Sequence, residues 1–256
     1  MKIFPAAFPV AALTALVALS GCSPAGRTPI VPVPVAAVTP ASPADAPPLA
    51  IHWFRNSAEM RSLYIEIYRA AGDQLMRLAS SAAPGTWAVI LDADETVLDN
   101  SLQQKEQAAI HAAYSDSAWR IWVRKEAAPA LPGSTEFIDL AHQLGGRVVI
   151  VSNREAVLCD ATRSNFIKDS LEVDAILCKA AVSDKNPRFE SVENGTAAPN
   201  LPRLKVLMWI GDNIQDFPRM TQAARSAFDS AYANFGRTWF LLPNPMYGSW
   251  ERVEYR

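Results

Sequence analysis

From residue 87 onward, apolar residues gather into short runs of strand length, separated by longer stretches with helical spacing. Four runs are clear, each ending at a turn or a polar residue, and a fifth is weaker: 87–91, 148–151, 175–178, 205–210 and 238–242. Runs of this length that are apolar almost throughout are typical of strands buried on both faces of a sheet. The pattern therefore predicts five strands.

Helical spacing of apolar residues fills the intervals. Residues 49–80 predict one or two helices, ended by Pro84-Gly85, and residues 135–144 and 156–171 predict two more. Strands that alternate with helices indicate an α/β fold: a Rossmann-like parallel sheet with helices on both faces. Such sheets bind ligands at the carboxyl ends of their strands.

Polar side chains that could bind a ligand or take part in catalysis follow the predicted strands at that edge. Asp92 and Asp94 come directly after the first strand, and Ser152-Asn153 follow the second. Asp212 follows the run at 205–210, and Lys185 lies a few residues beyond the run at 175–178. The carboxyl ends of parallel strands meet at one edge, so we expect acids, a hydroxyl and a cation to converge there.

The N-terminus has the pattern of an export signal. A lysine precedes the apolar stretch 3–19, which ends in L-S-G-C at Cys22. The stretch is short for a membrane span and contains prolines, so residues 1–21 predict a signal peptide. The residues before Cys22 resemble a bacterial lipobox, which implies lipidation of Cys22 and a lipid-anchored protein of the bacterial outer membrane. The alternative is a cleaved signal with an incidental cysteine.

Composition divides the remaining chain. Residues 22–48 are rich in proline and alanine with almost no charge, which predicts a stiff tether. Residues 49–256 are then the folded domain. The whole chain is 256 residues long, half apolar, with a net charge of −2, which gives no reason to expect nucleic acid as a partner.

Export permits a disulfide between Cys159 and Cys178, and two buried thiols are the alternative.

The motifs at the strand ends resemble those of haloacid dehalogenase-like phosphatases: D-x-D-x-T, S-N-R, a later lysine and G-D-x-x-x-D, in that order. The closer variants I-L-D-A-D-E-T-V-L-D-N-S, V-V-I-V-S-N-R and G-D-N-I-Q-D-F look like those of class C acid phosphatases. The resemblance runs from about Trp53 to about Glu251 and includes the lipobox. It implies a phosphomonoesterase, with a small, mainly helical cap beside the sheet.

The resemblance also implies catalytic roles. Asp92 matches a nucleophile that forms an aspartyl phosphate, and Asp94 matches the general acid and base. Phosphoryl-transfer pumps of this superfamily carry threonine at the position of Asp94, so its presence favours hydrolysis. Thr96 matches a residue that shapes the substrate loop, while Ser152 and Asn153 match groups that bind phosphoryl oxygens.

A cation is needed because a carboxylate and a phosphate dianion repel each other. Asp92, the backbone carbonyl of Asp94 and Asp212 match ligands of Mg²⁺, which prefers oxygen donors. Lys185 matches the cation between carboxylate and phosphate. Asp216 is expected to support the metal site from behind the ligands.

Other polar residues in these motifs have simpler interpretations. Asp99, Asn100 and Ser101 have the spacing of a cap for the following helix, and we leave them out of the catalytic set. Arg154 and Arg188 fit either a phosphate contact or a salt bridge.

Aromatic residues suggest what carries the phosphate. Trp122 lies between the first two motifs, and Tyr247 and Trp250 follow the fifth predicted strand. The resemblance implies that rings bind a nucleobase there, and Trp122 and Tyr247 are the pair expected to do so. Packing in the cap or the core is the alternative.

The sequence thus predicts an exported, metal-dependent acid phosphatase for phosphomonoesters, with nucleoside 5′-monophosphates as the expected substrates. Two rivals remain: a phosphotransferase, and a surface lipoprotein that uses the fold for binding. The oligomeric state, the pH optimum and the orientation in the membrane stay open.

Overall fold

The computed structural model describes residues 46–254 of the chain. The predicted signal peptide, Cys22 and nearly all of the predicted tether lie outside these residues. None of the described helices combines the length and the apolar composition that a membrane span requires.

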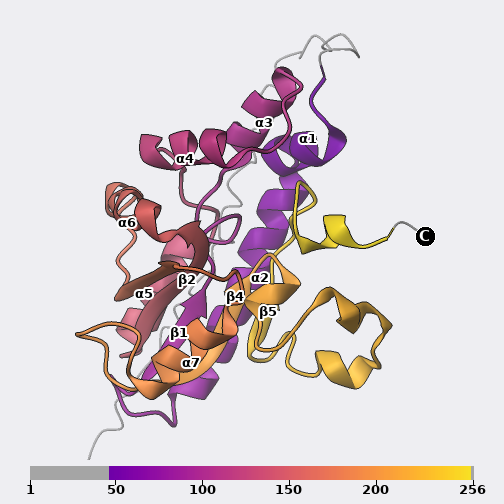
Figure 1. The fold of residues 1–256 in the computed structure, drawn as a ribbon. Coiled ribbons are helices and arrows are strands. Elements are labelled where there is room, and N and C mark those ends of the chain that lie inside the picture. Colours follow the sequence, from indigo (N-terminus) through magenta and orange to yellow (C-terminus); the bar gives the residue numbers. More distant parts are fainter. Residues whose placement is uncertain (1–45, 255–256) are drawn as a thin grey trace, which may run out of the picture. The chain divides into compact units, whose positions relative to one another are not determined.

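Five parallel strands form one sheet in the order β3-β2-β1-β4-β5 (Figure 1). All five predicted strands are present, with small changes at their ends: β1 Trp87–Leu91, β2 Arg147–Glu155, β3 Ala175–Lys179, β4 Lys205–Gly211 and β5 Trp239–Leu241. The predicted α/β fold is confirmed.

The predicted helices are also present. Residues 49–80 form two helices, α1 Leu49–Asn56 and α2 Ala58–Ala79. The chain turns between them at Ser57, whose extended backbone and hydroxyl cap α2 by accepting the amide of Met60. The patterns at 135–144 and 156–171 correspond to α5 Ser134–Gln143 and α6 Cys159–Lys168, and the structure adds α7 Asn186–Asn194, which was not predicted. The pattern at 156–171 is shorter as a helix than predicted, because its first turn is the 3₁₀-helix η1 Ala156–Leu158.

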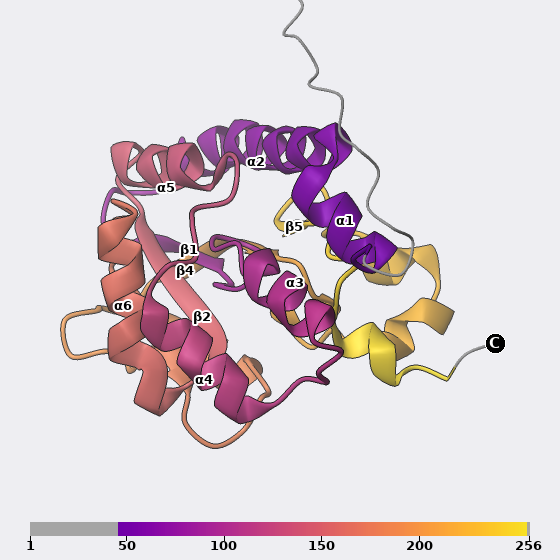
Figure 2. The same cartoon turned by 90° about the horizontal axis from the view of Figure 1, so that it is seen from above.

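Two apolar layers fix the helices to the sheet, because successive strand residues point to opposite faces. Trp87, Val89 and Leu91 face the larger core with side chains of α1, α2, α5 and α6, while Ala88 and Ile90 face α7. Figure 2 shows α2 and α5 side by side.

The predicted helical cap consists of α3 Ser101–Ala109 and α4 Asp116–Lys125, between β1 and α5. Figure 1 shows both helices in magenta, beyond the end of β2. Side chains of α4 contact residues at the carboxyl end of β2, so the cap covers part of the edge where the motifs converge.

Beyond β4 the chain makes short 3₁₀ turns and little regular structure: η2 Ile214–Asp216, η3 Gln222–Ser226, η4 Asp229–Tyr232 and η5 Ser249–Arg252. Figure 1 shows the segment with η3 and η4 beside β5, the three-residue edge strand of the sheet.

Candidate active site

The loop after β1 begins at Asp92, whose main chain is still hydrogen-bonded to the sheet. The amide of Asp92 donates to the carbonyl of Ile210 in β4, and the chain then folds back so that the amides of Val97 and Leu98 both donate to the carbonyl of Ala93. Glu95, at the tip, has a left-handed backbone with φ +51°. Such a conformation is uncommon for a residue with a side chain and persists only where surrounding contacts fix it.

Two tyrosines one helical turn apart on α2 supply such contacts. The hydroxyl of Tyr64 donates to the carbonyl of Glu95 at 2.5 Å, and that of Tyr68 donates to the carbonyl of Thr96 at 2.8 Å. Burial, together with nearby carboxylates, raises the pKa of both phenols well above the usual value. Both therefore remain donors and hold the loop from behind.

Three carboxylates from two strand ends meet at the centre of the site. Oxygens of Asp92, Asp212 and Asp216 lie within 4.8 Å of one another. Asp212 is held on one side by the hydroxyl of Thr96, at 3.2 Å, and on the other by the amide of Asn244, at 2.8 Å. The predicted substrate residue Thr96 is thus buried and bonds a carboxylate.

Lys185 joins two of these carboxylates. Its Nζ lies 2.5 Å from Oδ1 of Asp92 and 2.7 Å from Oδ1 of Asp216. The second oxygen of Asp216 accepts the amide of Asn213, so both its oxygens already have donors, which suits the supporting position predicted for it. Burial opposes the charge of Lys185, but the Asp216 and Asp92 carboxylates outweigh burial and raise its pKa above the usual value.

The cluster has more negative charge than one lysine can offset. Burial raises the pKa of Asp92 to about 7, with Lys185 opposing the shift and Asp216 and Asp94 adding to it. Burial also raises the pKa of Asp212 well above its usual value, and the Asp216 and Asp92 carboxylates add to the effect. Buried acids in this state favour any cation that can lie among them.

Asp94 has a separate set of partners. Its Oδ1 accepts the amide of Asn100 at 2.9 Å and Nε of Arg154 at 2.9 Å, and Nη2 of Arg154 lies 2.8 Å away. The guanidinium is 1% exposed. Arg154, which the sequence left between two interpretations, therefore forms a buried salt bridge with Asp94.

The two residues predicted to bind phosphoryl oxygens lie at the end of β2. The buried hydroxyl of Ser152 accepts the amide of Arg154 at 3.0 Å, and its own proton is free to point elsewhere. Asn153 is exposed, and its side-chain oxygen accepts Nη2 of Arg188 at 2.7 Å. Arg188 also donates to the carbonyl of Ser152, which ties α7 and the Lys185 loop to β2.

Two sequence interpretations need correction. Asn100 makes no capping bond to α3 with its side chain; it is fully buried and bonds Asp94, so it belongs to the site. Trp122 is 3% exposed, and its indole N–H donates to Asn100 at 2.8 Å. With that burial it presents no open face to a nucleobase, and the alternative of core packing describes it better.

Tyr247, the other ring expected to bind a nucleobase, is half-buried, with a buried hydroxyl that has no partner among the described residues.

Asn244 is the site residue that the sequence analysis missed. It follows β5 directly within L-P-N-P, so the strand-end rule applied to the fifth strand would have found it. The two tyrosines of α2 carry no motif of their own, and their role becomes visible only with the fold.

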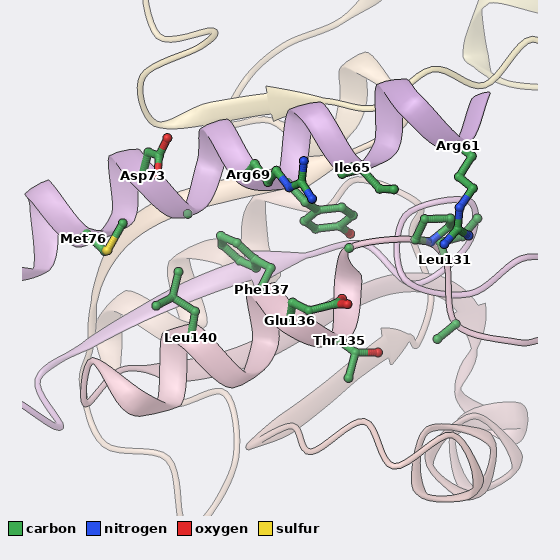
Figure 3. A pocket seen from close by; sticks show the side chains of 15 residues that line it. Arg61, Ile65, Arg69, Asp73, Met76, Leu131, Thr135, Glu136, Phe137 and Leu140 are labelled. Atoms are coloured by element: carbon green, nitrogen blue, oxygen red, sulfur yellow. The ribbon is translucent and has the colours of Figure 1, made fainter. Parts of the chain in front are cut away.

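A groove of about 740 Å³ runs between α2 and α5 (Figure 3). Figure 3 shows Arg61 and Arg69 from α2 and Glu136 and Phe137 from α5 along it. The strand-end acids do not line it. The groove is therefore separate from the catalytic edge.

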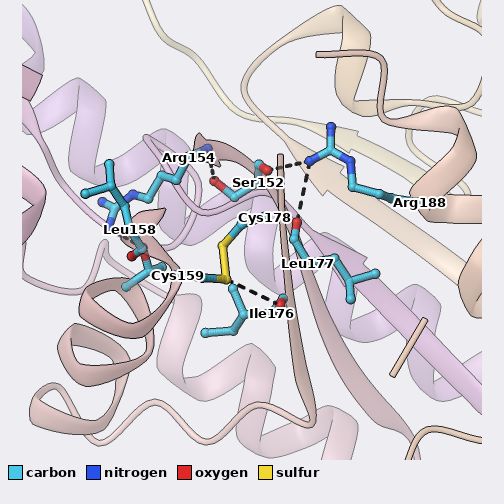
Figure 4. Close-up of a disulfide and its surroundings, with 9 residues drawn as sticks. Ser152, Arg154, Leu158, Cys159, Ile176, Leu177, Cys178 and Arg188 are labelled. Atoms are coloured by element: carbon cyan, nitrogen blue, oxygen red, sulfur yellow. Dashed lines mark hydrogen bonds between the residues drawn. A yellow bond between two sulfur atoms is a disulfide. The ribbon is translucent and has the colours of Figure 1, made fainter. Parts of the chain in front are cut away.

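A disulfide joins Cys159, at the start of α6, to Cys178 in β3, with the two Cα atoms 5.9 Å apart (Figure 4). Of the two alternatives left by the sequence, the structure has the bridge. Figure 4 places it below the end of β2, where Ser152 and Arg188 meet. The bridge therefore links α6 to β3, the strand that pairs with β2.

The parallel sheet, the acids and lysine at its carboxyl edge and the helical cap define a phosphoryl-transfer enzyme of the haloacid dehalogenase-like (HAD) class. Residues 33–250 match the family model for the HAD superfamily, subfamily IIIB (Acid phosphatase), and the chain belongs to that family. It is thus an acid phosphatase that hydrolyses small-molecule phosphomonoesters.

Two solved structures of class C acid phosphatases resemble this chain and agree with the family assignment. The class C acid phosphatase from Bacillus anthracis is 30% identical, with a TM-score of 0.71 over 79% of this chain and 85% of that one. A second structure of the Bacillus anthracis enzyme, with tungstate bound, is 28% identical with a TM-score of 0.69 and the same coverage. The family was therefore correctly predicted from the motifs.

Proposed function

We propose that this phosphatase is Mg²⁺-dependent, works through an aspartyl phosphate on Asp92 and acts on nucleoside 5′-monophosphates. The observation that carries the catalytic part is the meeting of Asp92, Asp212 and Asp216 around a single lysine. Carboxylates crowded at a strand end, with two pKa values raised, are the arrangement that a hard divalent cation stabilises.

The residues present fit such a cation. Asp92 and Asp212 would hold it, and the backbone carbonyl of Asp94 accepts no hydrogen bond from the described residues, so it is available as the third protein ligand. When bound, the cation would neutralise the carboxylates and stabilise charge on the phosphoryl oxygens. Asp216 would act by fixing Lys185.

The reaction then consists of two displacements at phosphorus, in which Asp92, Asp94 and Lys185 have different roles. In the first, an oxygen of Asp92 attacks phosphorus, the ester P–O bond breaks, and Asp94 gives its proton to the departing alkoxide. In the second, Asp94 takes a proton from water as that water attacks phosphorus, and the bond to Asp92 breaks. Inorganic phosphate leaves and both carboxyl groups return to their starting forms. Lys185 stays charged and stabilises the transferring group.

The nucleotide part rests on space and aromatic rings beside Asp212. The lining of a cavity of about 400 Å³ includes Asp212, Asn244, Tyr232 and Trp250. Trp250 is 47% exposed, and Tyr247 lies three residues before it. This volume has room for a nucleoside, and stacking on a ring tolerates any base. The tungstate bound by the Bacillus anthracis relative supports an oxyanion site in this family.

We also propose that the protein is anchored by lipid to the bacterial outer membrane. The lipobox-like residues before Cys22 support a lipid anchor, and Ser23 directly after that cysteine favours the bacterial outer membrane. Labelling of the full-length protein with a fatty acid, compared with a Cys22→Ala variant, tests the anchor. Equal labelling of both would refute it.

A substrate screen tests the catalytic proposal. Purified enzyme and Asp92→Asn would be assayed on nucleoside 5′-monophosphates and alkyl phosphates, in EDTA and with Mg²⁺ restored. We expect turnover that EDTA removes and Mg²⁺ returns, with nucleotides preferred, and acid-quenched phosphoenzyme in the parent only. Phosphoenzyme trapped in Asp92→Asn would refute the nucleophile, and transfer to added alcohols in place of water would identify a phosphotransferase.

A further inference from the structure

The cap helix α4 reaches the acid–base residue through a chain of buried hydrogen bonds. We propose that Asn100 and Trp122 are positioning residues: the indole of Trp122 fixes the amide of Asn100, and that amide, together with Arg154, fixes Asp94. The inference rests on the proposed role of Asp94 as general acid and base.

The Asn100 amide can have only one orientation. An indole N–H is only a donor, and an ionised carboxylate is only an acceptor. Trp122 donates to the side-chain oxygen of Asn100 at 2.8 Å, which leaves the NH₂ group toward Asp94, at 2.9 Å. Nη2 of Arg154 donates to the same Asn100 oxygen at 3.2 Å. Flipping the amide would break all three bonds.

This orientation determines how Asp94 presents its carboxyl group. The N–H groups of Asn100 and Arg154 all converge on Oδ1. Oδ2 accepts no hydrogen bond from the described part of the chain. One oxygen is therefore anchored, and the other is left to exchange a proton with the leaving group and with water, since the Asp94 side chain is 17% exposed.

The rest of α4 supports the same two partners. The guanidinium of Arg154 lies 5.7 Å from the centre of the Trp119 ring, a cation–π distance. Arg120 donates twice to the neighbouring Glu155, at 2.6 and 2.8 Å. Trp119 and Trp122, three residues apart on α4, therefore contact Arg154 and Asn100 respectively.

The matched control is a second buried tryptophan. Trp87 is fully buried, its indole N–H has no partner in the described structure, and it lies at the start of β1, at the opposite edge of the sheet from Asp92. Trp122→Phe and Trp87→Phe remove the same atoms from comparably buried sites. Only the first removes a donor to Asn100.

The test measures kcat/KM for p-nitrophenyl phosphate, whose leaving group needs little protonation, and for an alkyl phosphate, whose leaving group needs it. We expect Trp122→Phe to lose about tenfold on the alkyl ester and less than twofold on the aryl ester, a part of the 10²–10⁴ that a general acid supplies. Trp87→Phe should leave the ratio of the two values unchanged. A Trp122→Phe ratio equal to that of Trp87→Phe would overturn the inference.

A second variant keeps the test valid if Trp122→Phe does not fold. Asn100→Asp keeps the side-chain shape and the acceptor for Trp122, but in its ionised form it cannot donate to Asp94, so the assay is run at a pH where the variant's activity no longer changes with pH. We expect at least a tenfold change in the same ratio, and parallel losses on both esters would overturn the inference. Asp94→Asn separates this from the proposed function: equal losses in Asp94→Asn would refute the acid itself, whereas a selective loss there with none in the other variants refutes only the positioning.

Discussion

The hydroxyl of Tyr68 donates to the main-chain carbonyl of Thr96 at 2.8 Å, so a helix without catalytic residues holds the loop that carries the nucleophile. Tyr68→Phe removes only this donor and leaves a buried carbonyl without a partner. We expect a loss of about 1–3 kcal/mol in the free energy of unfolding, measured with urea. Tyr114→Phe is the control, because Tyr114 is exposed and should change stability by less than about 0.5 kcal/mol. Equal effects in the two variants would contradict the role of Tyr68.

Asp92→Asn should abolish turnover and still fold. The amide is nearly the same shape but cannot form an acyl phosphate, and it removes one of three crowded carboxylates. We therefore expect a melting temperature without metal at least equal to that of the parent. A purified variant with about a tenth or more of the parent activity would show that Asp92 is not the nucleophile.

The response to Mg²⁺ should grow with pH. The pKa of Asp92 in the folded protein, about 7, exceeds its ordinary value of 3.8. Between these values the folded state holds a proton that the unfolded state has lost, so the metal-free protein loses stability as pH rises through this window. A bound cation replaces that proton.

Melting curves at pH 5 and pH 8, with EDTA or with Mg²⁺, measure this effect. We expect a larger increase in melting temperature from Mg²⁺ at pH 8, and a smaller dependence on pH in Asp92→Asn. An Mg²⁺ effect that is equal at both pH values, or larger at pH 5, would contradict the assignment of the metal to these carboxylates.

The disulfide should stabilise the domain. Cys159 and Cys178 are 19 residues apart, and closing a loop of this size contributes about 3 kcal/mol by restricting the unfolded chain. Dithiothreitol should therefore lower the melting temperature of the parent and leave that of the double variant Cys159→Ala/Cys178→Ala unchanged. Titration of two thiols besides Cys22 in denatured, unreduced protein would exclude the bridge.

Replacing Tyr247 with alanine tests the nucleotide proposal. If the ring stacks on the base, which contributes about 1–3 kcal/mol, KM for nucleoside 5′-monophosphates should rise about fivefold or more, while KM for alkyl phosphates stays within about twofold. Trp122→Phe provides a comparison, since its buried ring should not change KM selectively for nucleotides. The same increase for both substrate classes, at normal stability, would remove Tyr247 from base binding.

The strand-end acids could be predicted because they depend on local pattern alone: an apolar run fixes where a strand ends, and parallel strands end at one edge. Asn100 could not, since a polar residue before a helix matches a cap equally well and only burial against Arg154 and α4 separates the two. The prediction that Trp122 binds a nucleobase was wrong for a related reason, because the sequence does not show which side of a cap helix faces inward. The fold itself followed from four clear apolar runs and a weaker fifth, alternating with helical patterns.

The strand order has a consequence for the order of events in folding. β1 pairs with β4, and Thr96 bonds Asp212 across 116 residues of intervening chain. The loop after β1 can be held early by α2, which is local, whereas closing so long a segment comes at a greater cost in entropy. The acids of the two strands therefore meet only when β4 docks. We expect a cation that binds them to act only after this closure, so it should lengthen the lifetime of the native protein without hastening its formation.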